Sequence, residues 1–152
     1  MSDFTGPNVY TVVARHVDKR LDLDSGNKAD GTKLQLYKPL DDATYGPNQR
    51  FVFAHVGNDE YLIINAKSGT YLTASDDSKQ ITANLLPPLE KRIRWKIEPV
   101  KDRSGAYYIQ SVAFPNKVID ISGAKADDKT AALTYTKNNK HHQQFFLRSG
   151  AY

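Results

Sequence analysis

The sequence predicts an all-β domain built from three related repeats, and three observations support this prediction. A tyrosine followed two residues later by valine or isoleucine opens a strand-like run in each repeat, at Tyr10, Tyr61 and Tyr107. A second short apolar run is centred 12 or 13 residues after each of these tyrosines. Each repeat then ends on an aromatic residue, Phe51, Trp95 or Phe145. Self-similarity at a period of 46 to 51 residues is typical of repeat architectures.

The length fits one compact domain over residues 1–152, with repeats at approximately 8–58, 59–104 and 105–152. Within each repeat, short runs of β-branched and aromatic residues alternate with turn residues such as glycine, asparagine and aspartate. These runs number roughly four per repeat, which predicts about twelve strands in pseudo-threefold order.

The alternation of side chains along a strand predicts which residues face the core. In the run Leu21–Asp24 the leucines point inward and Asp22 points outward. In the run Leu34–Tyr37 the leucines again point inward, which leaves Gln35 and Tyr37 on the outer face. The three closing aromatic residues fall at equivalent places and are expected in the core, where each contributes roughly 1.5–3 kcal/mol.

Composition excludes several classes of protein. The net charge is +4, but the basic residues are scattered and the densest run, Lys91–Arg94, is expected on a solvated face, so no nucleic acid partner is predicted. The absence of cysteine excludes a disulfide scaffold and a thiolate metal site. The first residues lack a secretory signal and no apolar run approaches the ~20 residues that span a bilayer. We therefore expect a cytoplasmic protein without membrane insertion.

Catalytic and metal-binding patterns are also missing. His141 and His142 are adjacent, and neighbouring residues on a strand point to opposite faces, so they are not expected to share a metal. No phosphate-binding glycine loop and no recognisable nucleophile context occurs. The sequence predicts a protein that is not an enzyme and that needs no cofactor or metal.

The repeat carries a sequence motif that identifies a family. An aspartate follows the second strand-like run, and a glutamine stands two residues before the closing aromatic in repeats one and three, at Gln49 and Gln143. With these features the chain resembles the ricin B-type β-trefoil lectins, and over Tyr61–Ala74 and Arg94–Ile97 the small fungal agglutinins that lack a signal peptide. The resemblance implies a β-trefoil, in which three two-stranded hairpins form a short barrel and three cap it, and a non-enzymatic lectin function.

The resemblance also implies a site for terminal galactose or N-acetylgalactosamine in the first repeat. Asp22, Tyr37 and Asn48, followed by Gln49, match the family's aspartate, stacking aromatic and asparagine–glutamine pair. The chemistry is consistent, because a carboxylate accepts charge-assisted hydrogen bonds from sugar hydroxyls and an amide both donates and accepts. Gln35 shares the outer face and is expected to support Asp22 or to contact the sugar.

The other two repeats depart from this pattern. In the second repeat Thr73 replaces the aspartate and no Asn–Gln pair precedes Trp95, so that repeat is expected to serve as framework only. The third repeat keeps Asp120, but His142 replaces the asparagine. Its stacking position falls on Tyr135, or on Thr136 if Leu133 aligns with Leu34. The third repeat is therefore a candidate for a weaker second site.

A single shallow sugar site binds weakly, with an affinity of about millimolar to micromolar. Binding to glycoproteins on a cell surface then needs more than one site. With one good site per chain, a homodimer is the expected assembly.

Protease inhibition is the alternative function, because related fungal β-trefoils also present rigid loops to proteases. The loop Ser25–Gly31 is long, polar and basic. Lys28 has the chemistry to fill the acidic specificity pocket of a trypsin-like serine protease, and Asn27 is the alternative residue for that pocket.

Overall fold

Six of the strands form a closed barrel. The computed structural model describes residues 2–76 and 78–150 and contains twelve strands and short 3-10 turns, without an α-helix in those ranges. The ring runs through β1, β4, β5, β8, β9 and β12, and β12 closes it by pairing with β1. Their bounds are β1 Asn8–Ala14, β4 Arg50–His55, β5 Glu60–Asn65, β8 Arg94–Pro99, β9 Tyr107–Ser111 and β12 Phe145–Arg148.

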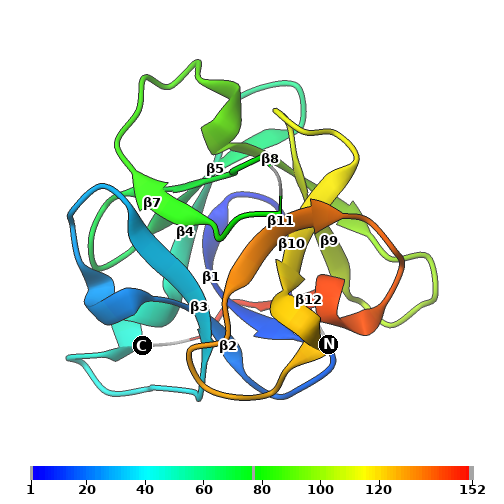
Figure 1. Cartoon of the computed structure of the whole chain (residues 1–152), viewed down its shortest axis with the longest axis horizontal. Coiled ribbons are helices and arrows are strands. Elements are labelled where there is room, and N and C mark those ends of the chain that lie inside the picture. The colour runs from blue at the N-terminus through cyan, green and yellow to red at the C-terminus, as the bar shows by residue number, and fades with distance from the viewer. Residues whose placement is uncertain (1, 77, 151–152) are drawn as a thin grey trace.

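The other six strands form three hairpins, one in each repeat. They are β2 Arg20–Leu23 with β3 Thr32–Tyr37, β6 Tyr71–Thr73 with β7 Thr82–Asn84, and β10 Lys117–Ile121 with β11 Ala132–Thr136. β3 pairs with β7, and bridges from Gln35 to Ala131 and from Gln80 to Leu133 join the second strand of each hairpin to its neighbour. In Figure 1, β3, β7 and β11 surround the centre of the view. This arrangement confirms the predicted all-β fold with three repeats and about twelve strands.

The three aromatic residues that close the repeats lie in one hydrophobic core. Phe51, Trp95 and Phe145 have no exposed surface, as predicted, and each stands near the start of a barrel strand. The indole nitrogen of Trp95 donates a hydrogen bond of 3.0 Å to the carbonyl oxygen of Leu72. The ring is therefore buried with its polar atom satisfied, which a buried indole requires.

Short 3-10 turns lie within the hairpins or between a hairpin and the next barrel strand. In the first repeat these turns are η1 (Asp24–Gly26) and η2 (Gly46–Gln49), and in the third they are η4 (Ser122–Ala124) and η5 (His141–Gln143). Among the described residues of the second repeat, the 3-10 turn is η3 (Lys91–Ile93). Within the described residues, no helix is long and apolar enough to cross a membrane.

We expect Trp95→Ala to lower the free energy of unfolding by roughly 3–5 kcal/mol, because it removes a fully buried ring and leaves a cavity. Urea unfolding measures this loss. Leu89→Ala is the matched control, because Leu89 is 84% exposed and its loss is expected to change stability by less than ~0.5 kcal/mol. Equal effects of the two changes would contradict the assignment of Trp95 as a core anchor.

Candidate functional site

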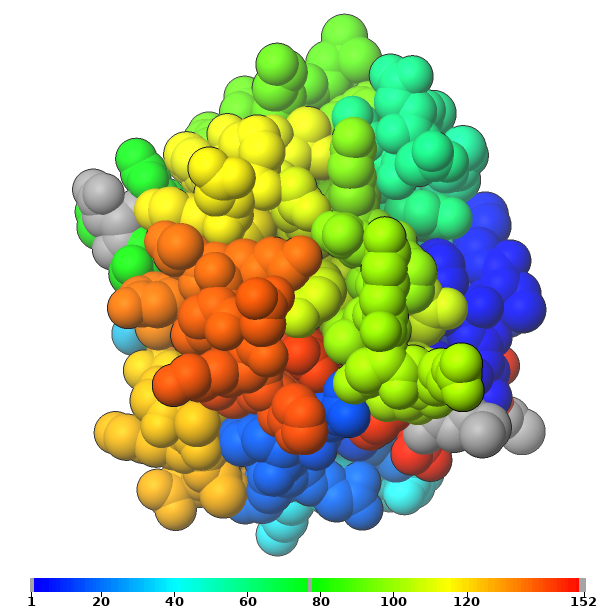
Figure 2. Space-filling model, turned by 90° about the vertical axis from the view of Figure 1, so that its right-hand side faces the viewer, coloured from blue at the N-terminus to red at the C-terminus, as the bar shows by residue number. Residues whose placement is uncertain are grey.

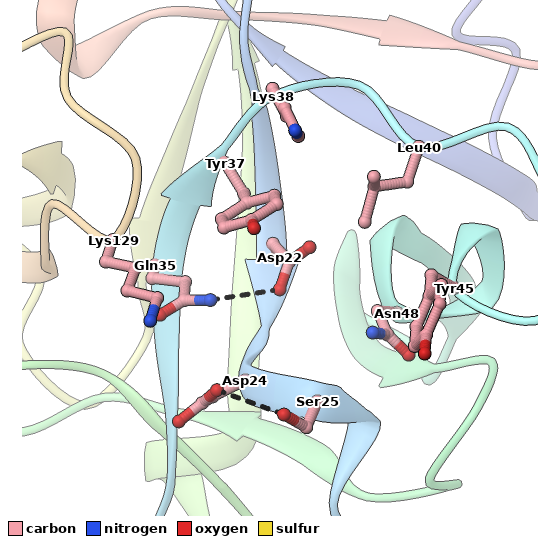
Figure 3. Close-up of a pocket in the computed structure, with 10 residues that line it drawn as sticks. All are labelled: Asp22, Asp24, Ser25, Gln35, Tyr37, Lys38, Leu40, Tyr45, Asn48 and Lys129. Atoms are coloured by element: carbon pink, nitrogen blue, oxygen red, sulfur yellow. Dashed lines mark hydrogen bonds between the residues drawn. The ribbon is translucent and has the colours of Figure 1, made fainter.

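The outer face of the first hairpin carries a hollow of about 380 Å³. Four of the five residues predicted for the first-repeat site line it: Asp22, Gln35, Tyr37 and Asn48. They come from β2, β3 and η2, which the fold brings together although up to 26 positions separate them in the sequence (48 − 22). Figure 3 shows these side chains around one space.

Asp22 forms the floor of the hollow, held by two amide side chains. Gln35 donates a hydrogen bond of 3.2 Å to Oδ1, and Gln49 donates one of 2.9 Å to Oδ2. Asp22 is only 2% exposed. It points away from the hydrophobic core, as predicted, and the two glutamines and the rim of the hollow cover it.

Burial raises the pKa of Asp22 from 3.8 to about 6, because desolvation penalises the charged form. The hydrogen bonds from Gln49 and Gln35 act in the opposite direction, and the nearby charges of Asp24 and Asp128 raise the pKa further. At neutral pH the group is a carboxylate with unused acceptor capacity, since two amide hydrogen bonds leave lone pairs free.

Gln49 does not line the hollow. It is fully buried behind Asp22, and its Nε2 also donates to the carbonyl oxygen of Lys38 at 2.8 Å. Its Oε1 accepts a hydrogen bond from the backbone N–H of Leu40 at 2.9 Å. Gln49 therefore positions the carboxylate and the rim segment that follows β3, and it has no direct access to a ligand.

Asn48 presents an amide whose hydrogen bonds within the described residues are incomplete. The side chain is 4% exposed, and Oδ1 is buried without a hydrogen-bond partner in the described structure. Gly26 makes this position possible, because a Cβ there would lie 2.5 Å from Oδ1 and the residue has φ +59°. Figure 3 shows the amide nitrogen on the side that faces Asp22. Asn48 can therefore donate into the hollow.

Two tyrosines stand on opposite sides of the hollow. Tyr37, half-buried at the end of β3, lies beside Asp22, as predicted. Tyr45 precedes η2 and is 58% exposed. Tyr45 was not predicted as a site residue. The same holds for five more residues that line the hollow: Asp24, Ser25, Lys38, Leu40 and, from the third repeat, Lys129. The proximity of an aromatic residue to the Gly46–Asn48 turn was the available signal for Tyr45.

The third repeat carries a corresponding hollow of about 540 Å³ lined by Asp120, Tyr135 and His142. The strand register decides which residue is equivalent to Tyr37. Asp22 pairs with Gln35 and Asp120 pairs with Leu133, so Tyr135, two residues further along the strand, takes the place of Tyr37. The alignment of Leu133 with Leu34, which would have placed Thr136 there, is wrong by one residue.

The carboxylate of the third hollow is held differently. Gln143 donates a hydrogen bond of 2.8 Å to Asp120, as Gln49 does to Asp22. Apolar Leu133, however, takes the place of Gln35. The imidazole Nε2 of His142 lies 3.3 Å from Asp120 Oδ2. Burial raises the pKa of Asp120, opposed by Gln143 and His142. Figure 2 shows gold and orange parts of the third repeat beside a blue part of the first. The ring centroids of His16 and His142 lie 6.2 Å apart.

The described residues of the second repeat form no such arrangement. Thr73 pairs with Thr82 at the position of Asp22 and Gln35, and Asn84 takes the place of Tyr37. Buried Ile93 stands where Gln49 stands in the first repeat. The second repeat thus lacks both the acid and the aromatic at the positions equivalent to Asp22 and Tyr37.

The loop proposed for protease binding lies beside the first hollow. Asn27 and Lys28 are both exposed, and Asn27 has extended backbone angles of φ −66° and ψ 143°. The loop's end is tied to the second repeat, where Asp30 Oδ1 accepts from the backbone N–H of Leu85 at 3.0 Å. Over residues 2–76 and 78–150, no three histidine, aspartate or glutamate side chains gather as a metal site.

The barrel, the three capping hairpins and the polar hollows define a β-trefoil of the lectin type. A family model described as ricin-type beta-trefoil lectin domain-like matches residues 47–135. An agglutinin from Sclerotinia sclerotiorum is 30% identical over 102 residues, which cover 63% of this chain and 65% of the relative. The match thus spans slightly less than two thirds of that relative's length.

Solved structures agree on the fold. The Rhizoctonia solani agglutinin superposes with a TM-score of 0.83 at 22% identity over 97% of this chain and 98% of its own. A Macrolepiota procera ricin B-like lectin, solved in complex with lactose, superposes with a TM-score of 0.80 at 21% identity over 98% and 100%. A designed threefold symmetric protein, ThreeFoil, superposes with a TM-score of 0.81 at 22% identity over 91% of this chain and 96% of its own. The chain belongs to the family of ricin-type β-trefoil lectin domain-like proteins.

The pKa of Asp22 predicts how stability depends on pH. The folded protein binds this proton more tightly than the unfolded chain does, so the stabilisation is complete below about pH 4 and is lost as pH rises through about 6. In Asp22→Asn the side chain does not ionise, so the variant does not lose stability at this position as the pH rises. We expect the variant's melting temperature to rise relative to wild type as pH increases from 4 to 7, measured by calorimetry. A constant difference across that range would contradict a raised pKa at Asp22.

Proposed function

We propose that the protein is a non-enzymatic lectin that binds terminal galactose or N-acetylgalactosamine through the first-repeat hollow. One observation carries the proposal: the buried Asp22 carboxylate and the Asn48 amide, both with unused hydrogen-bonding capacity, face a hollow whose side is the Tyr37 ring. Membership of a lectin family supports carbohydrate as the ligand class. The lactose complex of the Macrolepiota procera protein supports a galactoside.

Each side chain has a distinct task in this proposal. Asp22 accepts hydrogen bonds from two neighbouring sugar hydroxyls, and Asn48 donates to a third oxygen. The Tyr37 ring covers the apolar C–H face of the pyranose. Gln35 and Gln49 hold the carboxylate in place, so that it needs no reorganisation when the sugar enters.

The third-repeat hollow is proposed as a weaker second site. It retains the acid, the aromatic and the glutamine, but Leu133 supplies no amide, and His142 occupies one side of Asp120. Two sites on one chain, or a homodimer, would provide the multivalency that cell-surface binding requires. Size exclusion combined with haemagglutination tests this: a monomer that agglutinates cells favours two sites, whereas a dimer favours one site per chain.

Replacing the carboxylate tests the site directly. We expect Asp22→Asn to weaken lactose binding by about ten- to a hundredfold, because the amide loses the charge-assisted hydrogen bonds of roughly 1.5–3 kcal/mol. Titration calorimetry at pH 7.5 measures this. Binding by the wild type is expected to weaken below about pH 6, where Asp22 takes up its proton.

Asp120→Asn is the matched control, since it makes the same change in the third repeat. It should leave the high-affinity component unchanged. Unaltered lactose affinity in Asp22→Asn, with a folded protein by circular dichroism, would rule out the first hollow as the main sugar site.

Inhibition of a trypsin-like serine protease is the second candidate function. The exposed, extended backbone at Asn27 and the exposed Lys28 favour it, because inhibitors present such a segment to the protease cleft. A stoichiometric trypsin assay separates the two functions. Inhibition that survives Asp22→Asn and is lost in Asn27→Ala or Lys28→Ala supports the loop, and the absence of inhibition at a tenfold molar excess of the protein rejects it.

A further inference from the structure

Lys129 belongs to the third repeat but lines the hollow of the first. It corresponds to Gly31 of the first repeat, because Lys129 follows Asp120 by the same number of positions as Gly31 follows Asp22 (129 − 120 = 31 − 22). Their contacts agree. The backbone N–H of Gly31 donates a hydrogen bond of 3.2 Å to the carbonyl oxygen of Ala83. The backbone N–H of Lys129 donates one of 2.7 Å to the carbonyl oxygen of Leu36, and in each case the acceptor lies on the hairpin of the neighbouring repeat. The third repeat's loop is thereby fixed against the sugar site.

The backbone at this position favours glycine. Gly31 has φ +88° and Lys129 has φ +71°, both in the left-handed region that is unfavourable for a residue with a Cβ. The first repeat has glycine at this position, whereas the third repeat has a lysine that adopts the same unfavourable backbone conformation. A residue held in an unfavourable conformation beside a binding hollow is a candidate for a role of its side chain.

The charges around the hollow leave two ammonium groups available. Lys38 and Lys129 both line it, and neither makes an ion pair with another described residue. Among the neighbouring acids, Asp128 pairs with Lys19 at 2.8 Å and accepts the backbone N–H of Lys38, and its pKa is lowered first by Lys19 and also by the charge of Lys38. Asp22 accepts hydrogen bonds from two neutral glutamines and keeps its own charge. Asp24 accepts a hydrogen bond from Ser25 at 3.4 Å. In Figure 3, Lys38 and Lys129 stand on different sides of Tyr37.

We propose that Lys129, assisted by Lys38, makes the first-repeat site prefer galactosides that carry an oxyanion substituent. This inference rests on the proposed function, because Asp22 and Tyr37 hold the hexose in both cases. The ammonium groups attract the oxyanion attached to that hexose, and charge-assisted contacts at an exposed rim add a modest increment. A sulfate ester and the carboxylate of an acidic sugar share this chemistry.

The test compares lactose, a sulfated lactose and a lactose that bears a carboxylated sugar, by titration calorimetry at low salt. Wild type is expected to bind an acidic probe about three- to tenfold more tightly than lactose, and this preference should shrink at about 1 M salt. Lys129→Met removes the charge and keeps the Cβ, and it should lose most of the preference while lactose affinity stays constant. A preference for one acidic probe alone identifies sulfate or carboxylate as the source.

Two further variants separate charge from conformation. Lys129→Gly should lose the preference and also raise Tm by a few degrees, because glycine suits the left-handed backbone. Lys33→Met is the matched control, since Lys33 is exposed on β3 without lining the hollow. It should change neither the preference for acidic probes nor Tm.

Two results would overturn the inference while leaving the proposed function intact. One is equal binding of all three probes by the wild type. The other is a preference for acidic probes that survives in both Lys129→Met and Lys129→Gly. A wild type that binds none of the three probes would reject the proposed function and the inference together.

Discussion

Burial of one aromatic ring at the start of a barrel strand is the constraint on which the candidate sites depend. Phe51 is fully buried, and Gln49, two residues earlier, is fully buried with it at the end of η2. Anchoring the ring thus fixes the glutamine, which holds Asp22 at 2.9 Å. Phe145 and Gln143 repeat the arrangement with Asp120 at 2.8 Å. The hydrophobic core and the polar hollow are therefore parts of one packed unit, and a shift in the core would displace the carboxylate.

The second repeat shows what happens when that unit contains no acid. Thr73 replaces the aspartate and Ile93 replaces the glutamine, while Trp95 keeps the anchor. The two replacements are physically coupled, because a buried glutamine without its carboxylate partner would leave amide hydrogens unsatisfied, at a cost of roughly 1–3 kcal/mol. An isoleucine fills the space without polar atoms. The fold therefore requires the aromatic anchor in each repeat, whereas the polar pair is needed only where there is a site.

The sequence predicts the parts of the site that lie on strands, and the family resemblance adds Asn48 on η2, but the other residues that turns and loops supply were not predicted. The spacing of the tyrosines was enough to predict the twelve strands. The alternation of leucines was enough to predict that Gln35 and Tyr37 lie on the outer face, since a period of two determines the face of each residue. The choice between Tyr135 and Thr136 needed the pairing of β10 with β11, because a slip of one residue exchanges the faces. Tyr45 and Lys129 come from loops, where no periodicity specifies direction, and Lys129 comes from another repeat.

The electrostatics of Asp22 support the proposal of a neutral ligand with hydroxyl donors in the hollow. No cation is within hydrogen-bond distance of its carboxylate among the described residues, and its partners are two neutral amides. Burial without a counter-ion raises the pKa to about 6, so the ionised form reduces stability at neutral pH. Hydroxyl donors from a ligand relieve this cost without adding a charge that must itself be desolvated. A site whose polar groups are positioned but incompletely satisfied is thus stabilised most by a rigid molecule with several hydroxyls and one apolar face.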